Sequence, residues 1–195
     1  MADQARDVIE ACAALNRRGF ALGAIDGLGG SGKSTLARRV QAERAASAIV
    51  EMDDFYRPKP EAQREGLSPR EGFSRYFDWQ RLRAQVLKPL RAGQTARYRP
   101  YDWERGAIGS REVVVPASGL VIVEGVYTLR PQLRPFWDLT VYVEASREVR
   151  LARLLTRNEN TRAQIDRWMA AERYFEETFV PLERADIVVV DTGSS

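Results

Sequence analysis

Residues 27–35 read Gly27-Leu28-Gly29-Gly30-Ser31-Gly32-Lys33-Ser34-Thr35, which matches the phosphate-loop pattern G-x-x-x-x-G-K-[S/T]. The apolar segment 20–26 before it predicts a buried strand, and Leu36, Ala37 and Val40 after it recur at helical spacing. A strand, a glycine-rich loop and a helix in this order form the context in which the pattern binds phosphate. The alternative is a glycine turn that opens a helix and binds no ligand.

The residue types of this loop suit a nucleoside triphosphate. Glycines let the backbone turn so that successive N–H groups face the phosphates, and the N-terminus of the following helix adds a partial positive charge. Lys33 is expected to reach the β- and γ-phosphates, and the Ser34 hydroxyl to bind Mg²⁺. We therefore predict nucleotide binding by the loop residues Gly27, Gly29, Gly30, Ser31, Gly32, Lys33, Ser34 and Thr35.

Length and composition predict one globular domain over residues 1–195, because 44% of the residues are apolar and 29% are charged. No apolar run reaches the ~18 residues of a membrane span. Residues 1–10 also lack the apolar core of a signal peptide, so we expect a cytoplasmic protein with no membrane partner. The net charge of +3 comes from arginines spread along the chain, which favours a charged surface and a local phosphate site over a nucleic-acid partner.

The sequence contains no histidine, which excludes a histidine base, a Ser-His-Asp triad and any zinc site that uses histidine. General-base chemistry must therefore fall to a carboxylate. The single cysteine, Cys12, cannot form an internal disulfide and shares one side of an expected helix with Val8, Ile9 and Leu15. We predict that it is a small core residue.

Strand-like and helix-like segments alternate, which predicts an α/β fold with a parallel sheet of about five strands and helices on both faces. The expected strands are 20–26, 48–52, 119–125, 139–143 and 187–190. The expected helices are 3–17, the phosphate-loop helix, one that begins after an N-cap at Asp78, and two near 151–155 and 165–175.

Two segments interrupt this alternation. Residues 95–99 and 111–115 predict short strands of a small antiparallel appendage, about residues 95–116, of the kind that carries substrate contacts. Residues 57–75 predict a mobile polar loop, because they contain the breakers Pro58, Pro60, Gly66, Pro69 and Gly72.

Acidic residues follow two of the expected strands. Asp53 and Asp54 come directly after strand 48–52, and Glu124 lies at the end of strand 119–125. Ligands of open α/β sheets gather at the carboxyl ends of the strands, so these acids are well placed for chemistry. The alternative for the Asp53-Asp54 pair is a turn in which the side chains bond to the backbone.

Taken together, these motifs resemble the uridine kinase family of phosphate-loop (P-loop) kinases, with its relatives phosphoribulokinase and pantothenate kinase. The similarity runs from about Phe20 to Val190 and rests on the order and spacing of several motifs. They are Gly27 to Thr35, Asp53-Asp54-Phe55-Tyr56, Phe77-Asp78, Arg99-Pro100-Tyr101-Asp102-Trp103, Val121 to Gly125, Asp138 to Glu144 and Ala185-Asp186-Ile187.

The resemblance implies roles for individual residues. Asp53 would accept the proton of the acceptor hydroxyl, and Glu124 would help to hold Mg²⁺ through water. Lys33, Ser34, the metal and Arg157 would neutralise the charge of the transferring phosphoryl group. Residues 157–163 would form the lid that closes over the phosphates. Arg162, near the end of this lid, is expected among the substrate-binding residues.

The acceptor site implied by the resemblance is aromatic. Uridine kinases surround the nucleoside with positions that match Tyr56, Phe77, Asp78, Tyr101 and Trp103, so that Trp103 would stack on a base and Asp78 would bind sugar hydroxyls. The alternative is that the aromatic residues form the core of the appendage. Uridine kinases also carry a histidine after the Tyr-Asp-aromatic motif, where this sequence has residues 104–107, Glu-Arg-Gly-Ala, so we predict loose discrimination among bases.

The leading expectation is a kinase that uses ATP and Mg²⁺ to phosphorylate a hydroxyl of a small-molecule acceptor, with uridine or cytidine first. Kinases of pantothenate, nicotinamide riboside or a sugar remain alternatives. A regulatory nucleotide-binding protein has no need of a substrate base such as Asp53. An enzyme that hydrolyses nucleotides on nucleic acid is disfavoured by the lack of a basic tract. A homo-oligomer is compatible with the sequence, which does not fix the oligomeric state.

Overall fold

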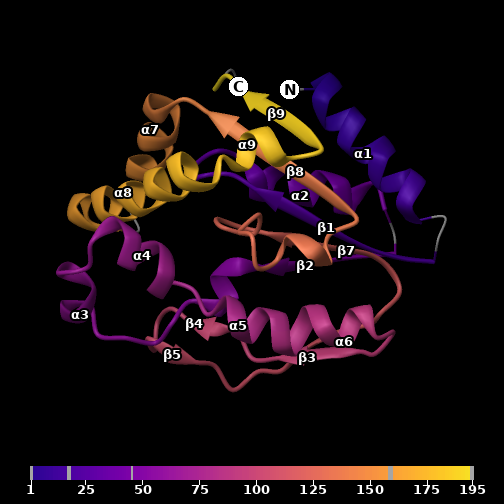
Figure 1. Ribbon diagram of the computed structural model, residues 1–195, viewed down its shortest axis with the longest axis horizontal. Coiled ribbons are helices and arrows are strands. Elements are labelled where there is room, and N and C mark those ends of the chain that lie inside the picture. The colour runs from indigo at the N-terminus through magenta and orange to yellow at the C-terminus, as the bar shows by residue number, and fades with distance from the viewer. Residues whose placement is uncertain (1, 17–18, 45, 158–159, 194–195) are drawn as a thin grey trace.

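A five-stranded parallel sheet forms the centre of the protein (Figure 1). The structure, a computed structural model, describes residues 2–16, 19–44, 46–157 and 160–193. The strand order is β2-β7-β1-β8-β9, and each neighbouring pair is parallel. The predicted α/β fold is confirmed, with strands β1 (Phe20–Asp26), β2 (Ser47–Glu51), β7 (Gly119–Glu124), β8 (Leu139–Ala145) and β9 (Ile187–Asp191).

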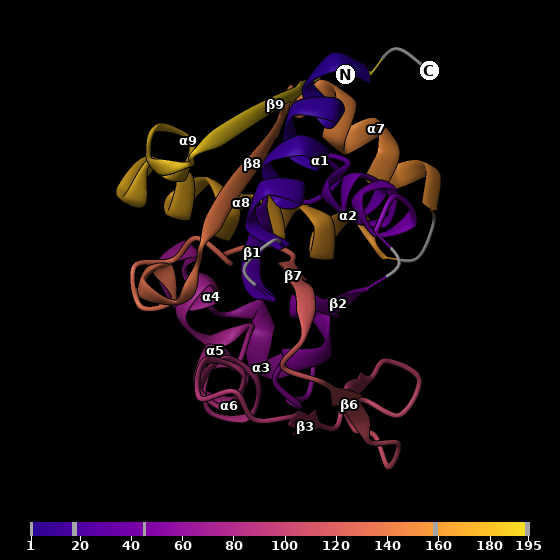
Figure 2. The ribbon, with the colours of Figure 1, turned by 90° about the vertical axis from the view of Figure 1, so that its right-hand side faces the viewer.

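Helices cover both faces of this sheet (Figure 2). One face carries α1 (Ala2–Asn16) and α2 (Lys33–Ala42). The other carries α4 (Pro69–Arg75), α8 (Arg162–Phe179) and one helical run made of α5 (Trp79–Leu82), η2 (Arg83–Leu87) and α6 (Lys88–Arg91). The remaining helices are η1 (Met52–Phe55), α3 (Ala62–Glu65), η3 (Arg134–Phe136), α7 (Arg147–Arg157) and α9 (Pro181–Arg184). Among the described residues, no helix is long and apolar enough to cross a bilayer.

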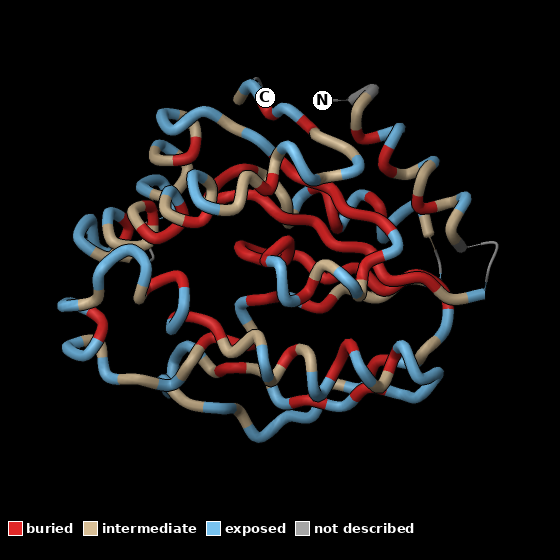
Figure 3. Tube along the Cα trace, viewed as in Figure 1, coloured by how far each residue is buried: buried red, intermediate tan, exposed pale blue. Residues whose placement is uncertain are grey.

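Side chains alternate between the two faces along each strand, as the period of two requires. On β1, Leu22 and Ala24 face α4, α5 and α8, whereas Ala21 and Ile25 face α1 and α2. Both sets are buried, and Figure 3 shows the central strands β1, β7 and β8 mostly buried, between helices whose outer sides are exposed. Burial on both faces explains why these strands read as nearly unbroken apolar runs.

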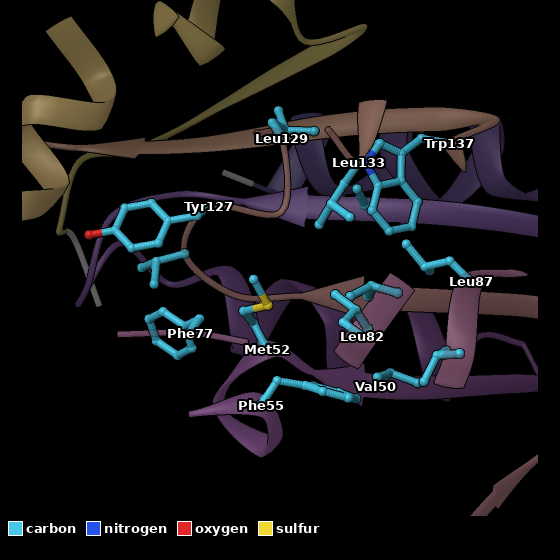
Figure 4. Packing of buried hydrophobic residues seen from close by; sticks show 14 of the residues in the cluster. Val50, Met52, Phe55, Phe77, Leu82, Leu87, Tyr127, Leu129, Leu133 and Trp137 are labelled. Atoms are coloured by element: carbon cyan, nitrogen blue, oxygen red, sulfur yellow. The ribbon is translucent and has the colours of Figure 1, made fainter. Parts of the chain in front are cut away.

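The larger of the two cores lies beneath the helical run α5–α6. In Figure 4, Leu133 and Trp137 come from the segment between β7 and β8 and lie near Leu82 and Leu87 of that run. The predicted N-cap of this run is confirmed, because the Asp78 side chain accepts a hydrogen bond from the Arg81 N–H at 3.1 Å. The π turn at Arg83–Leu87 adjoins Pro89, which has no N–H to donate to the preceding turn.

The first helix also behaves as predicted. Val8 and Cys12 are buried against the sheet, and burial raises the pKa of the Cys12 thiol to about 11. A thiol that stays protonated in this way is a packing residue and not a nucleophile.

Residues 57–75 are not the irregular loop that their prolines and glycines predicted. They include α3 and α4, and α4 packs against α8. Pro69 is the first residue of α4, where a missing N–H costs nothing, and Ser68 and Glu71 form a capping box. A Cβ on Gly72 would lie 2.9 Å from the Cβ of Ala171, so glycine at this position lets the two helices approach closely.

The predicted appendage is confirmed as two antiparallel pairs of short strands. β3 (Ala96–Tyr98) pairs with β6 (Val113–Val115), and β4 (Tyr101–Asp102) pairs with β5 (Ala107–Ile108). The Tyr98 hydroxyl donates to Asp54 Oδ2 at 2.7 Å. This bond joins the appendage to the segment that follows β2.

A fully buried carboxylate joins β1 to the segment after β7. Asp26 Oδ1 accepts the N–H groups of Gly27 and Tyr127 at 2.7 and 3.1 Å, and Oδ2 accepts that of Leu129 at 2.7 Å. Tyr127 is held in the left-handed region, with φ of 67°. Burial raises the pKa of Asp26 to about 7, although the three N–H donors and Lys33 act in the opposite direction.

This raised pKa predicts a pH-dependent stability. Between the ordinary pKa of 3.8 and the folded value of about 7, the folded protein holds a proton that the unfolded chain has released. The contribution of Asp26 is therefore complete below about pH 4 and decreases as the pH rises to 7. We expect the free energy of unfolding of the wild type, relative to Asp26→Asn, to fall by on the order of 2 kcal/mol between pH 5 and 7.5 in urea titrations. If this difference in unfolding free energy stays constant or rises with pH, the three N–H donors affect the pKa of Asp26 more strongly than burial does.

Candidate active site

The phosphate loop connects β1 to α2 through a backbone that requires glycine. Gly30 and Gly32 have φ of 80° and 99°, which side chains other than glycine rarely adopt. A Cβ on Gly30 would lie 2.7 Å from the Arg150 carbonyl oxygen, and one on Gly32 would lie 2.7 Å from Asp191 Oδ2. Because α2 begins at Lys33, its free N–H groups lie directly at the loop. The predicted strand, loop and helix are thus all present.

Two ion pairs, which the sequence analysis did not predict, hold the loop. Arg153 Nη1 donates to the Gly30 carbonyl at 3.1 Å, and its guanidinium forms two bonds with Asp191 at the end of β9. Glu172 Oε2 on α8 accepts the Gly29 N–H at 3.0 Å and lies 3.4 Å from Arg150 Nη1. Both α7 and α8 therefore contact the phosphate loop.

Ser34 and Glu124, the predicted metal ligands, lie together. The Ser34 hydroxyl donates a hydrogen bond to the Glu124 carboxylate. Burial raises the pKa of Glu124, while Lys33 and this hydrogen bond lower it. Glu124 Oε2 is buried and has no hydrogen-bond partner among the described residues. An unsatisfied carboxylate oxygen beside a hydroxyl is the kind of oxygen set that suits Mg²⁺.

The described residues contain no group of three or more Asp, Glu or Cys side chains that could hold a metal by themselves. Mg²⁺ in nucleotide sites usually takes one or two protein ligands and completes its shell with water and phosphate oxygens. Ser34 and Glu124 thus fit a metal that is bound together with the nucleotide.

Asp53 lies near this pair because β2 and β7 are in register. Glu51 is directly opposite Glu124, and Asp53 follows two residues later on η1. Asp53 is exposed to solvent, although the protein packed around its carboxyl desolvates that group. This crowding raises its pKa, whereas Lys33 and Arg157 lower it. Lys33, Asp53, Glu124 and Arg157 therefore share one electrostatic environment.

Asp54 has structural contacts instead. Its carboxylate accepts the Tyr98 hydroxyl, as described above, and the Arg81 guanidinium donates to its backbone carbonyl. Of the two adjacent acids, Asp53 is the one whose carboxylate has no hydrogen-bond or ion-pair partner within the described chain and is influenced instead by Lys33 and Arg157. This difference supports Asp53 as the chemical member of the pair.

Four predicted acceptor residues form one aromatic cluster. Tyr56 stacks on Trp103 with ring centroids 4.7 Å apart, and its edge meets Phe77 and Tyr101 at 5.3 and 5.4 Å. Tyr56, Phe77 and Tyr101 are buried, which agrees with the core-packing alternative for these three. Trp103 is 52% exposed, so one large aromatic surface remains open to a ligand.

Asp78 and Arg162 complete the predicted set. The Asp78 N–H donates to the Phe55 carbonyl at 2.7 Å, which places Asp78 beside the Asp53–Tyr56 segment. Arg162 begins α8 and pairs with Asp166 on the same helix, where it is exposed and has no bond to the other predicted residues. The predicted lid, 157–163, falls partly outside the described residues, since these exclude 158–159.

A cavity of about 590 Å³ lies apart from this chemistry, between the end of β8 and α8. Its lining includes Tyr142, Glu144, Arg147, Asp166 and Arg173. Lys33, Ser34, Asp53 and Glu124 do not line it. We therefore build the active site on the phosphate loop and the strand ends.

Sequence comparison agrees with this arrangement. The pattern of the phosphoribulokinase/uridine kinase family matches residues 22–190, which include the phosphate loop and both acids. The chain belongs to this family. Uridine kinases from Halobacterium salinarum and Macrococcus caseolyticus are each 27% identical to it, over 90% and 88% of this chain and 82% and 88% of their own lengths.

Solved structures of similar fold extend the comparison within and beyond uridine kinases. A proposed uridine kinase from Bacillus stearothermophilus superimposes with a TM-score of 0.75 at 28% identity, covering 96% of this chain and 97% of its own. A proposed fructose transport system kinase from Silicibacter sp. TM1040 superimposes with a TM-score of 0.67 at 26% identity. The match covers 94% of this chain and 98% of that kinase. The P-loop kinase fold is therefore shared by proteins whose names indicate different acceptors.

The ion pair behind the loop generates a stability prediction. Glu172→Ala should leave Arg150 buried without its partner and free the Gly29 N–H, which should cost roughly 3 kcal/mol or more of unfolding free energy. The matched control is Glu177→Ala on the same helix, where the Arg173–Glu177 pair is exposed and contributes little. Urea titration of both variants measures the two losses. Equal losses would show that Glu172 has no special role in the loop.

Proposed function

We propose that this protein is an ATP- and Mg²⁺-dependent kinase that phosphorylates a hydroxyl of a small molecule, with a nucleoside such as uridine or cytidine as the first acceptor to test. The observation that carries the proposal is the Asp53 carboxylate, which lies in the cleft beside Lys33 and near Glu124. A protein that only binds nucleotide has no use for an unpaired carboxylate at this position.

In the proposed reaction, the protein mainly positions the reactants and neutralises charge. The loop N–H groups and Lys33 hold the phosphates. Ser34 and Glu124 would hold Mg²⁺, which supplies positive charge at the phosphate oxygens. Asp53 accepts the proton of the attacking hydroxyl. Arg157 adds positive charge on the lid side of the cleft.

Asp53 works as a base only in its ionised form. Desolvation by the surrounding protein raises its pKa, so Asp53 loses its proton at a higher pH than an ordinary aspartate, and turnover should increase with pH until that proton is lost. Lys33 and Arg157 limit this rise by favouring the carboxylate.

The identity of the acceptor rests on weaker support than the reaction type. The relatives named uridine kinase and the exposed Trp103 favour a flat base. The missing family histidine and the relative named for fructose transport keep a sugar or another metabolite as a second candidate. An assay of ATP consumption over nucleosides, sugars and vitamin precursors distinguishes these acceptors.

Asp53→Asn tests the base. The amide keeps the size of the side chain but cannot accept the proton, so transfer should fall by a factor on the order of 10² to 10⁴ while nucleotide binding survives. Asp54→Asn is the matched control and should retain most of the activity. ADP release and ATP binding are measured for each, beside Lys33→Ala, which should lose turnover without unfolding. An active Asp53→Asn with an inactive Asp54→Asn would reverse the assignment.

Trp103→Ala tests the acceptor contact. If Trp103 stacks on a flat ring, its loss should raise the acceptor KM roughly 5- to 150-fold, as expected for ~1–3 kcal/mol of stacking. The ATP KM should stay nearly unchanged. Ile108→Ala, another exposed apolar residue of the same hairpin, serves as the control. An enzyme that strictly prefers uridine, and keeps that preference in Trp103→Ala, would contradict this acceptor site but not the kinase activity.

A further inference from the structure

Arg130 is a buried arginine that the phosphate site does not use. It follows Leu129, whose N–H is bound by Asp26, and its own carbonyl accepts the N–H groups of Leu133 and Arg134 at 2.9 and 3.3 Å. The residue is only 3% exposed. Its backbone is therefore fixed on both sides, and its side chain is enclosed by the fold.

Two aromatic rings from different helices hold the guanidinium. Its central carbon lies 4.7 Å from the ring centroid of Phe73 on α4 and 4.7 Å from that of Trp79 on α5. Such contacts fix the position of the guanidinium plane but leave its edge, which carries the N–H groups, available for hydrogen bonds.

The Arg130 guanidinium has no carboxylate within 4.0 Å among the described residues, although the more distant Asp26 acts on it electrostatically. Its one side-chain hydrogen bond within the described chain runs from Nε to Gln132 Oε1 at 3.1 Å, while Nη1 is buried without a partner. The other buried arginines differ, since Arg64 pairs with Glu61 and Arg150 with Glu172. Burying a charge without a partner lowers the stability of the folded protein, so an unpaired buried arginine points to a role in binding.

The surroundings of Arg130 make an anion the natural partner. Burial lowers the pKa of Arg130 to about 10; Tyr127 and Asp26 raise this pKa, Arg57 lowers it, and the group stays protonated at neutral pH. A planar fork of N–H donors fits the two oxygens of a carboxylate or phosphate.

This fork lies beside the expected acceptor residues. Trp79, which covers the guanidinium, directly follows Asp78, and the Arg57 guanidinium reaches Asp78 Oδ1 at 3.5 Å. Phe73 packs against Tyr127, and Tyr127 packs against Phe77. Asp78 and Arg57 are about one-third exposed, and Arg57 is close enough to Arg130 to act on it electrostatically, so the expected acceptor residues connect Arg130 to the protein surface.

We propose that Arg130 binds a carboxylate or phosphate group carried by the acceptor, so that the acceptor is a hydroxy acid or a phosphate ester of an alcohol and not a neutral nucleoside. This rests on the proposed kinase activity, and it replaces the neutral nucleoside as the first acceptor by an anionic alcohol. The charge-assisted bonds of Arg130 would fix the anionic end of the molecule while its hydroxyl points to Asp53.

Kinetics with paired acceptors test the proposal. A neutral set (uridine, cytidine, D-fructose) is compared with an anionic set (D-glycerate, pantothenate, D-ribose 5-phosphate), and we expect a higher kcat/KM within the anionic set. Arg130→Met should raise the KM of that acceptor by on the order of 10- to 100-fold and leave the ATP KM unchanged. The KM of Arg130→Lys for that acceptor should lie between those of the wild type and Arg130→Met, because lysine keeps the positive charge but lacks the planar fork of N–H donors. The matched control is Arg173→Met, an exposed arginine on α8.

A ligand-binding measurement separates this proposal from the kinase assignment. Thermal shifts are recorded with D-glycerate, glycerol 3-phosphate, glycerol and inorganic phosphate in the Lys33→Ala background, which weakens phosphate binding at the loop. We expect the two anionic alcohols, but not glycerol, to stabilise the protein, and Arg130→Met to abolish this effect. Without ligand, Arg130→Met should melt no lower than its parent, because the charge it removes is unpaired.

Four outcomes would overturn the proposal. They are a better kcat/KM for uridine than for every anionic acceptor, an unchanged KM in Arg130→Met, stabilisation by inorganic phosphate alone, or a large loss of melting temperature in ligand-free Arg130→Met and Arg130→Lys that marks a purely structural arginine. Uridine turnover would leave the kinase function standing. Anion binding that depends on Arg130, in a protein that consumes no ATP with any acceptor, would contradict the kinase function while supporting the subsite.

Discussion

The register of three parallel strands is the constraint on which the active site depends. Ile25 of β1, Glu124 of β7 and Glu51 of β2 lie in one row across the sheet. Directly beyond this row come the phosphate loop, Gly125 and the Asp53 segment, and the Gly125 N–H bonds to the Ile25 carbonyl at 3.1 Å. A slip of one residue would turn Glu124 to the opposite face of the sheet. The apolar side chains that alternate along these strands, buried on both faces, hold the register against such a slip.

Lys33 is the charge around which the acids of the site are arranged. It offsets part of the rise in pKa that burial causes in Asp26, Asp53, Glu124 and Glu172, which come from four different parts of the chain. Without a nucleotide, these acids balance one lysine and would repel incoming phosphates. The loop N–H groups and the N-terminus of α2 offset part of that repulsion, and a divalent cation at Ser34 and Glu124 would offset more. The arrangement therefore favours the nucleotide as its metal complex.

The features that were predicted correctly from the sequence are those that short segments of the chain determine by themselves. The phosphate loop, the buried strands, the N-cap at Asp78 and the small appendage each depend on neighbours within a few residues, and all are present. Segment 57–75 was misjudged because Pro69 and Gly72 act there as a helix start and a packing contact, which only the presence of α8 reveals. Glu172 was missed for the same reason, since 143 residues separate it from the Gly29 N–H that it binds.

The two halves of the site are built on supports of different rigidity. Lys33, Glu124 and Asp53 follow directly from buried strands whose register cannot change without loss of the core. The proposed acceptor residues instead lie just after η1, between α4 and α5, in the segment after β7 and in the hairpin β4–β5, outside the central sheet. Changes in these segments can thus alter the acceptor without disturbing the phosphate loop. This separation accounts for a family in which one phosphate site serves acceptors as different as those named for its members.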